Sequence, residues 1–311
     1  MPEPVVRPFR RADREQLTGL VNAHVCAVVP GWAVSASALL AQIERDPGQY
    51  VTDPWVAERR TLVAEVDSRV VAAAHLRRYR DDSDVGSDWQ GAGEIAWLVC
   101  WPASEAAGER LGAACVRVLD AWGVARQLAD GDLPTSATYG IPDSWPHVGR
   151  ILTASGFDGA SARQELLLAG GLDAVPDPGP PPLEGLAVRR VVGTFGARFE
   201  AVVGGRVVGF VEAQDDHTRG GTLARLDGWA DLAELHVEPH VRGRRVGSWL
   251  MAHLVGWLRL GGTRRFLVAL GQDDIPLETW FARFGWRRIG EVRRGWERVA
   301  AAGGGASLHP R

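Results

Sequence analysis

Apolar and polar residues follow two periods along this chain, and the periods divide it into strands and helices. Strict alternation is typical of half-buried strands, and apolar residues three or four positions apart are typical of helices that pack on a sheet. In the first half the pattern predicts strands at residues 5–8, 60–66, 70–77, 94–101, 135–141 and 163–168. Helical spacing there predicts helices at residues 12–29, 35–44, 111–124 and 145–155.

A proline- and glycine-rich stretch, residues 169–185, interrupts this pattern and predicts a semi-rigid linker. Beyond it we expect strands at residues 186–190, 198–203, 206–213, 233–237, 266–270 and 287–292, and helices after Gly247 and at 276–284. The prediction is an α/β protein of two lobes, each with a mixed, mostly antiparallel central sheet flanked by helices. The expected domains are residues 1–168, the linker 169–185, residues 186–298, and a disordered tail at 299–311.

The two lobes differ between their first and second strands. Residues 9–59 leave room for two helices in the first lobe, whereas residues 191–197 are too few for one ordinary helix in the second. We therefore expect the second lobe to lack its first two helices. That side of its sheet is then either open or covered by the first lobe.

The stretch Glu234–Met251 carries the clearest chemical signal. Residues 234–238 alternate in polarity as a strand does, Pro239 ends the alternation, and a basic turn with two glycines leads into an apolar helix. The N–H groups at a helix N-terminus and the positive end of the helix dipole favour a phosphate, and glycine lets the phosphate come close. This arrangement predicts an anion site.

The turn, Arg242-Gly243-Arg244-Arg245-Val246-Gly247, resembles the Arg/Gln-x-x-Gly-x-Gly/Ala motif of the GNAT-type N-acetyltransferases, with Arg245 in place of the middle glycine. The resemblance implies a GNAT-like fold and acetyl-CoA as acyl donor, with the pyrophosphate on the turn and the pantetheine arm along Leu235 and Val237. The two-lobe arrangement is similar to that of mycothiol synthase-like proteins. The residues of the turn and helix start expected to bind acetyl-CoA are Arg242, Gly243, Arg244, Arg245, Val246, Gly247 and Ser248.

A second stretch, Asp274–Trp286, resembles the family's Asn-x-x-Ala-x-x-Phe-Tyr-x-x-x-Gly-Phe motif. In the family the asparagine touches the pantetheine arm and the tyrosine often protonates the leaving thiolate. Asp274 and Phe281 stand at these positions and are expected to line the cofactor site, although phenylalanine cannot donate a proton. A thiol pKa of about 8.5 makes thiolate a tolerable leaving group, and one general acid is worth about 10²–10⁴ in rate.

The first lobe contains a degenerate copy of this anion site. Ala107–Gly112, aligned with the turn of the second lobe, keeps both glycines but loses the leading arginine. It also gains Glu109, which would repel a phosphate.

Two side chains of the second lobe are candidates for the catalytic base. Glu234 is the first, acting directly or through water, and His236 is the alternative because its ordinary pKa near 6.5 suits proton transfer. The first lobe has Ala96 and Leu98 at the aligned positions. We therefore expect any chemistry to occur in the second lobe.

Composition restricts the partners, the cofactors and the cellular location that we expect. The net charge is −3, so neither nucleic acid nor an anionic membrane is an expected partner. Three cysteines without metal-ligand spacing predict neither a disulfide framework nor a metal site. Without a membrane-length apolar run or a signal segment, the expectation is a cytoplasmic monomer or homodimer.

Three hypotheses follow. The first is an N-acetyltransferase that moves acetyl from acetyl-CoA to a primary amine of a small molecule or a protein N-terminus by direct attack, with the first lobe shaping the acceptor site. The second is a catalytically inactive protein that binds acyl-CoA and acts as a regulatory or interaction module. The third is a scaffold without a CoA site.

Overall fold

The computed structural model describes residues 3–44, 53–134, 139–160, 162–214 and 228–299. The helices are α1 (Arg14–Val28), α2 (Ala36–Ile43), α3 (Glu105–Ala121), α4 (Pro146–Ala154), α5 (Val246–Leu260) and α6 (Glu278–Ala282). The strands before the middle of the chain are β1 (Val5–Pro8), β2 (Val56–Val66), β3 (Arg69–Tyr79), β4 (Gly93–Cys100), β5 (Arg126–Ala129), β6 (Ile141–Pro142) and β7 (Arg163–Gly171). The later strands are β8 (Leu186–Val192), β9 (Ala197–Val203), β10 (Arg206–Gln214), β11 (Trp229–Val237), β12 (Arg265–Leu270), β13 (Arg287–Arg294) and β14 (Trp296–Val299).

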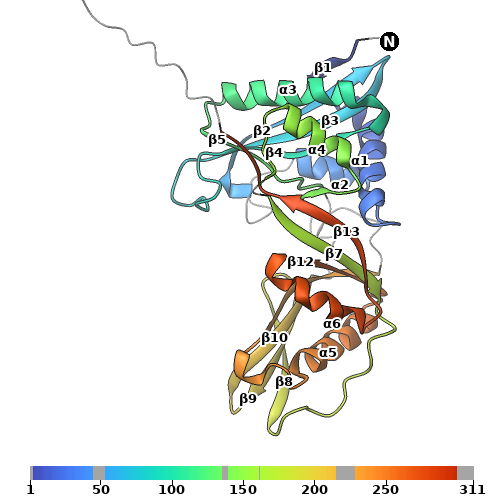
Figure 1. Ribbon diagram of the computed structural model, residues 1–311, viewed down its shortest axis with the longest axis vertical. Coiled ribbons are helices and arrows are strands. Elements are labelled where there is room, and N and C mark those ends of the chain that lie inside the picture. Colours follow the sequence, from blue (N-terminus) through green and yellow to red (C-terminus); the bar gives the residue numbers. More distant parts are fainter. Residues whose placement is uncertain (1–2, 45–52, 135–138, 161, 215–227, 300–311) are drawn as a thin grey trace, which may run out of the picture.

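These elements form two lobes, one above the other in Figure 1, and each lobe is built on one sheet. In the described residues the upper sheet has the strand order β1-β2-β3-β4-β5-β14, and the lower sheet has the order β6-β13-β7-β12-β11-β10-β9-β8. The pairs β4–β5 and β11–β12 are parallel, and the other paired strands are antiparallel. The predicted architecture of two lobes with mixed, mostly antiparallel sheets is confirmed.

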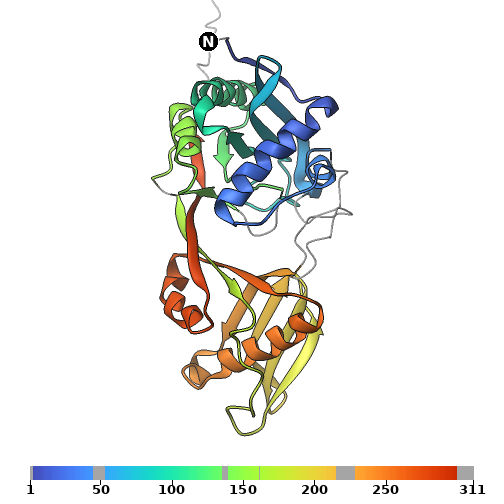
Figure 2. The same cartoon turned by 90° about the vertical axis from the view of Figure 1, so that its right-hand side faces the viewer.

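The lobes exchange strands, which the sequence did not predict. β7, expected to close the first lobe, lies in the lower sheet between β12 and β13. β14, the last strand, returns to the upper sheet and pairs with β5. β7 and β13 therefore run between the two lobes (Figures 1 and 2). Since each sheet contains strands from both halves of the chain, neither sheet is complete without the other half.

The interface between the lobes is apolar. One core cluster fills the first lobe and continues onto the lower sheet through Leu167, Trp229 and Leu267. A second cluster lies between the other face of the lower sheet and α5. The indole of Trp32, which follows α1, stacks on Trp229 with ring centroids 5.3 Å apart. Burial of aromatic rings of this size stabilises the contact.

The second lobe lacks the first two helices, as its length predicted. Only residues 193–196 connect β8 to β9. This loop folds back over the sheet, where the Gly196 N–H donates to the Glu212 carboxylate over 3.2 Å. None of the helices in the described part of the chain is long and apolar enough to cross a membrane.

One expected strand differs in the structure, and two short strands were not expected. Of the strand predicted at 135–141, residues 135–138 lie outside the described residues, and the strand that begins at Ile141 has two residues. β5 and β14 have four residues each and were not predicted, because segments this short show no clear alternation. The tail expected to be disordered lies outside the described residues from residue 300 onward.

Candidate functional site

The parallel strands β11 and β12 are paired only where they begin. Trp229 lies opposite Arg265, Ala230 opposite Phe266, and Asp231 opposite Leu267. β11 continues to Val237 and β12 to Leu270 without further pairing between them. The strands therefore diverge after Asp231, and the β11 backbone that follows presents donors and acceptors that β12 does not use.

A bulge in β11 lies just beyond this divergence. Glu234 is opposite Glu212, but Leu232 is opposite Ala213, so Ala233 is the extra residue. A bulge changes the alternation of faces, so Leu232 and Leu235 both pack on the core beneath α5. Asp231, Glu234 and His236 consequently share the opposite face of the sheet. The predicted alternation holds from Glu234 onward and breaks at Ala233.

Asp231 is the acidic residue that the sequence reasoning missed. Its side chain is 9% exposed, and burial raises the pKa of the Asp231 carboxyl to about 7, although a backbone hydrogen bond acts in the opposite direction. A carboxyl that titrates near neutral pH suits general base catalysis. An aspartate two residues after a tryptophan gives no sequence signal of this burial, because the residues that cover it lie elsewhere in the chain.

Glu234 and His236 are more accessible than Asp231. Glu234 is exposed, opposite Glu212. The His236 ring stacks on Phe210 with centroids 5.7 Å apart, and its Nε2 lies 3.7 Å from Glu238 Oε1. The structure therefore places both predicted candidates on the same face as Asp231, but further along β11 toward the turn.

The turn predicted to bind phosphate has the expected backbone form. Gly243 (φ +73°) and Arg245 (φ +66°) are both left-handed, and α5 begins at Val246 without a side-chain cap. The N–H groups of its first turn thus remain available. Arg242 Nε donates to the Val237 carbonyl over 2.8 Å, which fixes the turn against the end of β11.

The structure would accept a side chain at Gly247 without a steric clash. A Cβ at this position would lie 3.6 Å from Val237 Cγ2 and 3.9 Å from Trp280 Cζ2, which are ordinary contacts. The absence of a side chain therefore keeps the helix start open rather than preventing a clash. Val246 is buried, whereas Arg242, Arg244 and Arg245 are exposed around it. This combination fits a pyrophosphate.

The second motif is placed differently from the prediction. Phe281 is 1% exposed and stacks on Trp286 with centroids 5.4 Å apart, so it belongs to the core rather than to a ligand groove. Its neighbour Trp280 was missed. The Trp280 Nε1–H donates to Ser248 Oγ over 3.2 Å and brings α6 against the start of α5.

Asp274 lies in the segment that leads into α6. It is exposed in the short 3-10 segment Gln272–Leu277 after β12, and its backbone N–H bonds to the Gly271 carbonyl over 2.9 Å. Among the hydrogen bonds of the described residues, none joins its side chain to the turn at Arg242–Gly247.

The first lobe repeats the strand geometry with a different alignment from the predicted one. Ala96 is the extra residue of a bulge in β4 and precedes Pro102 by the same spacing as Ala233 precedes Pro239. The counterpart of Glu234 is therefore Trp97, not Ala96. By the same register the counterpart of His236 is Val99, not Leu98.

The counterpart of Asp231 in the first lobe is a buried carboxyl, Glu94, which is held inside the protein. Tyr79 donates to it over 2.6 Å, and Arg77 lies 3.8 Å away. Burial raises the pKa of Glu94 to about 7. Both lobes thus place a buried acid within the short parallel pairing of their central strands, at its last pair in the second lobe and at the pair before the last in the first.

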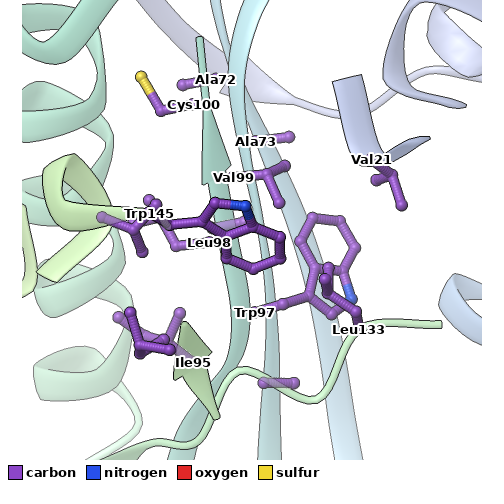
Figure 3. Close-up of a cluster of buried hydrophobic side chains, with 14 of the residues drawn as sticks. Val21, Ala72, Ala73, Ile95, Trp97, Leu98, Val99, Cys100, Leu133 and Trp145 are labelled. Atoms are coloured by element: carbon purple, nitrogen blue, oxygen red, sulfur yellow. The ribbon is translucent and has the colours of Figure 1, made fainter. Parts of the chain in front are cut away.

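In the first lobe, side chains of the protein itself occupy the region beside β4 that corresponds to the opening between β11 and β12. The rings of His24 and His147 each bond to the Cys100 carbonyl over 2.8 Å, at the position equivalent to Val237. The buried side chains of Trp145 and Leu133 pack beside β4 in the cluster drawn in Figure 3. The backbone that the second lobe leaves for a ligand is therefore occupied in the first.

The predicted degenerate loop at Ala107–Gly112 is also wrong, because these residues belong to α3. The two glycines allow α3 to pack on α4. A Cβ at Gly108 would come 2.4 Å from Ile151 Cδ1, and one at Gly112 would come 2.3 Å from Ser155 Oγ. Helix packing, not a phosphate, explains these glycines.

No group of three or more His, Cys, Asp or Glu side chains in the described residues is placed to hold a metal ion. Residues 174–286, which contain β11, the turn, α5 and β12, match the model of the Acetyltransferase (GNAT) family. These residues form a GNAT acetyltransferase domain. The sequence matches no curated protein.

The whole chain has the tandem GNAT fold. It superposes on a tandem GNAT protein from the clavulanic acid biosynthesis pathway with a TM-score of 0.68 and 14% identity, covering 96% of this chain and 99% of that one. A GCN5-related N-acetyltransferase from Sphaerobacter thermophilus gives 0.63 and 16% identity over 95% of both chains. The glucosamine N-acetyltransferase region of a fungal multi-domain β-N-acetylglucosaminidase gives a TM-score of 0.65 and 16% identity, covering 95% of this chain and 38% of the fungal protein.

Proposed function

We propose that the second lobe of this GNAT protein transfers acetyl from acetyl-CoA to a primary amine of a small molecule or peptide, with the first lobe shaping the acceptor site. The observation that carries the proposal is the arrangement along one strand. β11 separates from β12 at a buried acid, Asp231, and ends at a basic turn whose helix start is uncapped.

The turn holds the pyrophosphate in this proposal. The N–H groups of Val246, Gly247 and Ser248 and the positive end of the α5 dipole face the phosphates, and Arg242, Arg244 and Arg245 neutralise their charge. The pantetheine arm then lies along the backbone of Leu235 and Val237, beside Trp280. Asp274 and Phe281 are the remaining expected cofactor contacts. They are less suited, since the first is exposed in the segment after β12 and the second is in the core.

Asp231 serves as the base in this proposal, in preference to Glu234 and His236. The amine nitrogen bonds to the acetyl carbon, the carbon–sulfur bond breaks, sulfur leaves as thiolate, and the proton lost by the amine goes to the Asp231 carboxylate. A carboxyl with a pKa near 7 holds such a proton better than an exposed one does. Phe281 carries no hydroxyl, and the thiolate takes its proton from solvent.

Calorimetric titration with acetyl-CoA tests the binding half of the proposal. The wild type is expected to bind with about micromolar affinity, about −8 kcal/mol. An Arg242→Glu, Arg244→Glu variant should lose binding. The matched control is Arg69→Glu, Arg117→Glu, which makes the same charge change at exposed arginines of the first lobe and should bind normally.

Turnover assays test whether the bound acetyl group is transferred. Release of free CoA in the presence of an amine panel supports an acetyltransferase. Binding without CoA release for any amine would instead support an inactive acyl-CoA-binding module, and no binding to the wild type would leave the scaffold hypothesis.

A further inference from the structure

We infer that the loop of residues 193–196, between β8 and β9, forms the acceptor-side wall of the second-lobe site, and that Phe195 in this loop selects amines that carry an apolar group. The inference rests on the proposed acetyltransferase function. It goes beyond that function because it names the element that borders the acceptor, the residue that determines specificity and the class of acceptor.

Glu212 on β10 lies on the same face of the sheet as the proposed base, Asp231. Its neighbours Val211 and Ala213 pack in the core beneath α5, so the Glu212 side chain points to the opposite face. The strand register places Glu212 opposite Glu234, which follows Asp231 by three residues. Glu212 therefore lies one strand away from the part of β11 that has separated from β12.

The loop between β8 and β9 folds over the Glu212 carboxylate. The N–H groups of Phe195 and Gly196 both donate to Glu212 Oε1. A Cβ at Gly193 would come 2.3 Å from Glu212 Cδ, so no side chain fits there. Glu212 is 0% exposed beneath the loop, and Arg198 lies 3.5 Å from its Oε2. A buried carboxylate needs such donors, and the same hydrogen bonds hold the loop against the sheet.

Two parts of the protein thus flank Asp231 on this face. The first lobe lies on one side, where Trp32 stacks on Trp229, two residues before Asp231. The loop of residues 193–196 lies on the other side, over the residue opposite Glu234. An acceptor amine at Asp231 therefore lies between the first lobe and this loop.

Phe195 gives the loop an apolar side chain that can contact such an acceptor. Its backbone is held on Glu212, but the residue is 48% exposed, and its ring belongs to none of the hydrophobic clusters of the described residues. The ring therefore has apolar area left to bury against a ligand. Burial of an aromatic group corresponds to a factor of about 10 or more in affinity.

The test of Phe195 compares phenethylamine with ethylamine, which is the same amine without the phenyl ring. Phe195→Ala should lower kcat/KM for phenethylamine by about tenfold or more, through KM, and leave ethylamine unchanged. The control is Trp101→Ala, at an aromatic residue of the first lobe that is 37% exposed, and it should affect neither amine. The affinity for acetyl-CoA should not change in any variant.

Glu212 is tested as a positioning residue for the loop. Glu212→Ala should raise the KM for phenethylamine as much as Phe195→Ala does, and Glu212→Gln should raise it less because glutamine keeps an acceptor for the loop N–H groups. The double variant Glu212→Ala, Phe195→Ala should differ little from either single variant, since both changes act through the loop. The matched control is Glu200→Gln, at a buried glutamate that hydrogen-bonds to Arg189 rather than to the loop within the described residues.

Several results would overturn the inference. In Phe195→Ala they are equal losses for the two amines or no loss for either, and in the wild type a preference for ethylamine. Additive effects in the double variant, or an effect of Glu200→Gln as large as that of Glu212→Gln, would remove Glu212 from the role. If Glu212→Ala does not fold, Glu212→Gln and Phe195→Ala decide.

A binding measurement separates this inference from the proposed activity. If the wild type acetylates neither amine, phenethylamine is titrated calorimetrically into the wild type and Phe195→Ala in the presence of CoA. Binding that is about tenfold weaker in Phe195→Ala supports the loop as the acceptor-side wall although the proposed activity fails. Equal binding, or none to the wild type, rejects the inference.

Discussion

Asp231 on β11 and Leu267 on β12 are the last pair of residues that join these two parallel strands. Beyond this pair the strands separate, and the bulge at Ala233 follows at once. The pair therefore marks the closed end of the opening between β11 and β12, and the basic turn at Arg242–Gly247 marks its other end. The opening thus has a buried acid at its closed end and exposed arginines at its open end.

Replacing Asp231 by Asn tests its role as base. The amide keeps the shape but cannot accept the amine proton, so kcat should fall by about 10²–10⁴. The affinity for acetyl-CoA should stay the same, because the turn is distant along β11. Glu234→Gln is the matched control and should keep most of the activity. The opposite ranking of the two variants in steady-state kinetics would assign the base to Glu234.

The pH dependence of activity should report the same carboxyl. The pKa of Asp231 is raised to about 7, so the base is protonated and inactive below this pH. At saturating acetyl-CoA, kcat should fall about tenfold per pH unit below pH 7 and level off above it. The acidic limb should be absent from the residual activity of Asp231→Asn. A limb that persists in the variant with an unchanged midpoint would point to another group.

Arg245 offers a measurement of strain in the turn. It is a non-glycine residue with φ +66°, a conformation that costs about 1–2 kcal/mol outside glycine. Arg245→Gly and Arg245→Ala both remove the guanidinium, but only the first removes the strain. We expect Arg245→Gly to be more stable than Arg245→Ala by about 1 kcal/mol in denaturant unfolding. Equal stabilities would show that the left-handed conformation is not maintained without arginine.

The strand exchange predicts that the C-terminal strand stabilises the first lobe. Trp296 on β14 is 8% exposed in the first-lobe core, and a Cβ at Gly159 would come 2.8 Å from its ring. Trp296→Ala should lower the free energy of unfolding by about 3–5 kcal/mol. Trp101→Ala, at an exposed tryptophan, should have a much smaller effect. If thermal unfolding shows that Trp296→Ala and Trp101→Ala lose a similar amount of stability, the first lobe does not depend on β14.

The filled first lobe predicts the stoichiometry of binding. His24, His147 and Trp145 occupy the region beside β4 that corresponds to the proposed pantetheine path in the second lobe. Calorimetry should therefore give one acetyl-CoA per chain. Two equivalents, or binding that survives in Arg242→Glu, Arg244→Glu, would contradict this assignment.

Local patterns in the sequence determined much of the architecture. The hairpin over Gly204-Gly205 and the turn at Asp67-Ser68 have the positive φ values that such turns need. The basic turn before α5 and the missing helices of the second lobe were likewise readable, because spacing and chain length are properties of the segment itself.

The alignment of the lobes was predicted only in part. Ala96 was matched with Glu234, although Pro102 and Pro239 follow Ala96 and Ala233 at the same spacing and match Ala96 with Ala233 from the sequence alone. In the same way, the two glycines near Glu109 fit a loop motif, although their helix needs them for contact with α4.

Only the tertiary structure decided which strands pair across the lobes and which acid is buried. The partners of β7 and β14 lie 94 or more residues away along the chain, and alternation within a strand does not specify its neighbour. The raised pKa of Asp231 comes from its burial, which the neighbouring sequence does not indicate. The sequence determined the local conformations and the basic turn, whereas the packing of distant segments buried the acid at the other end of the opening, because burial is a property of the surroundings and not of the residue.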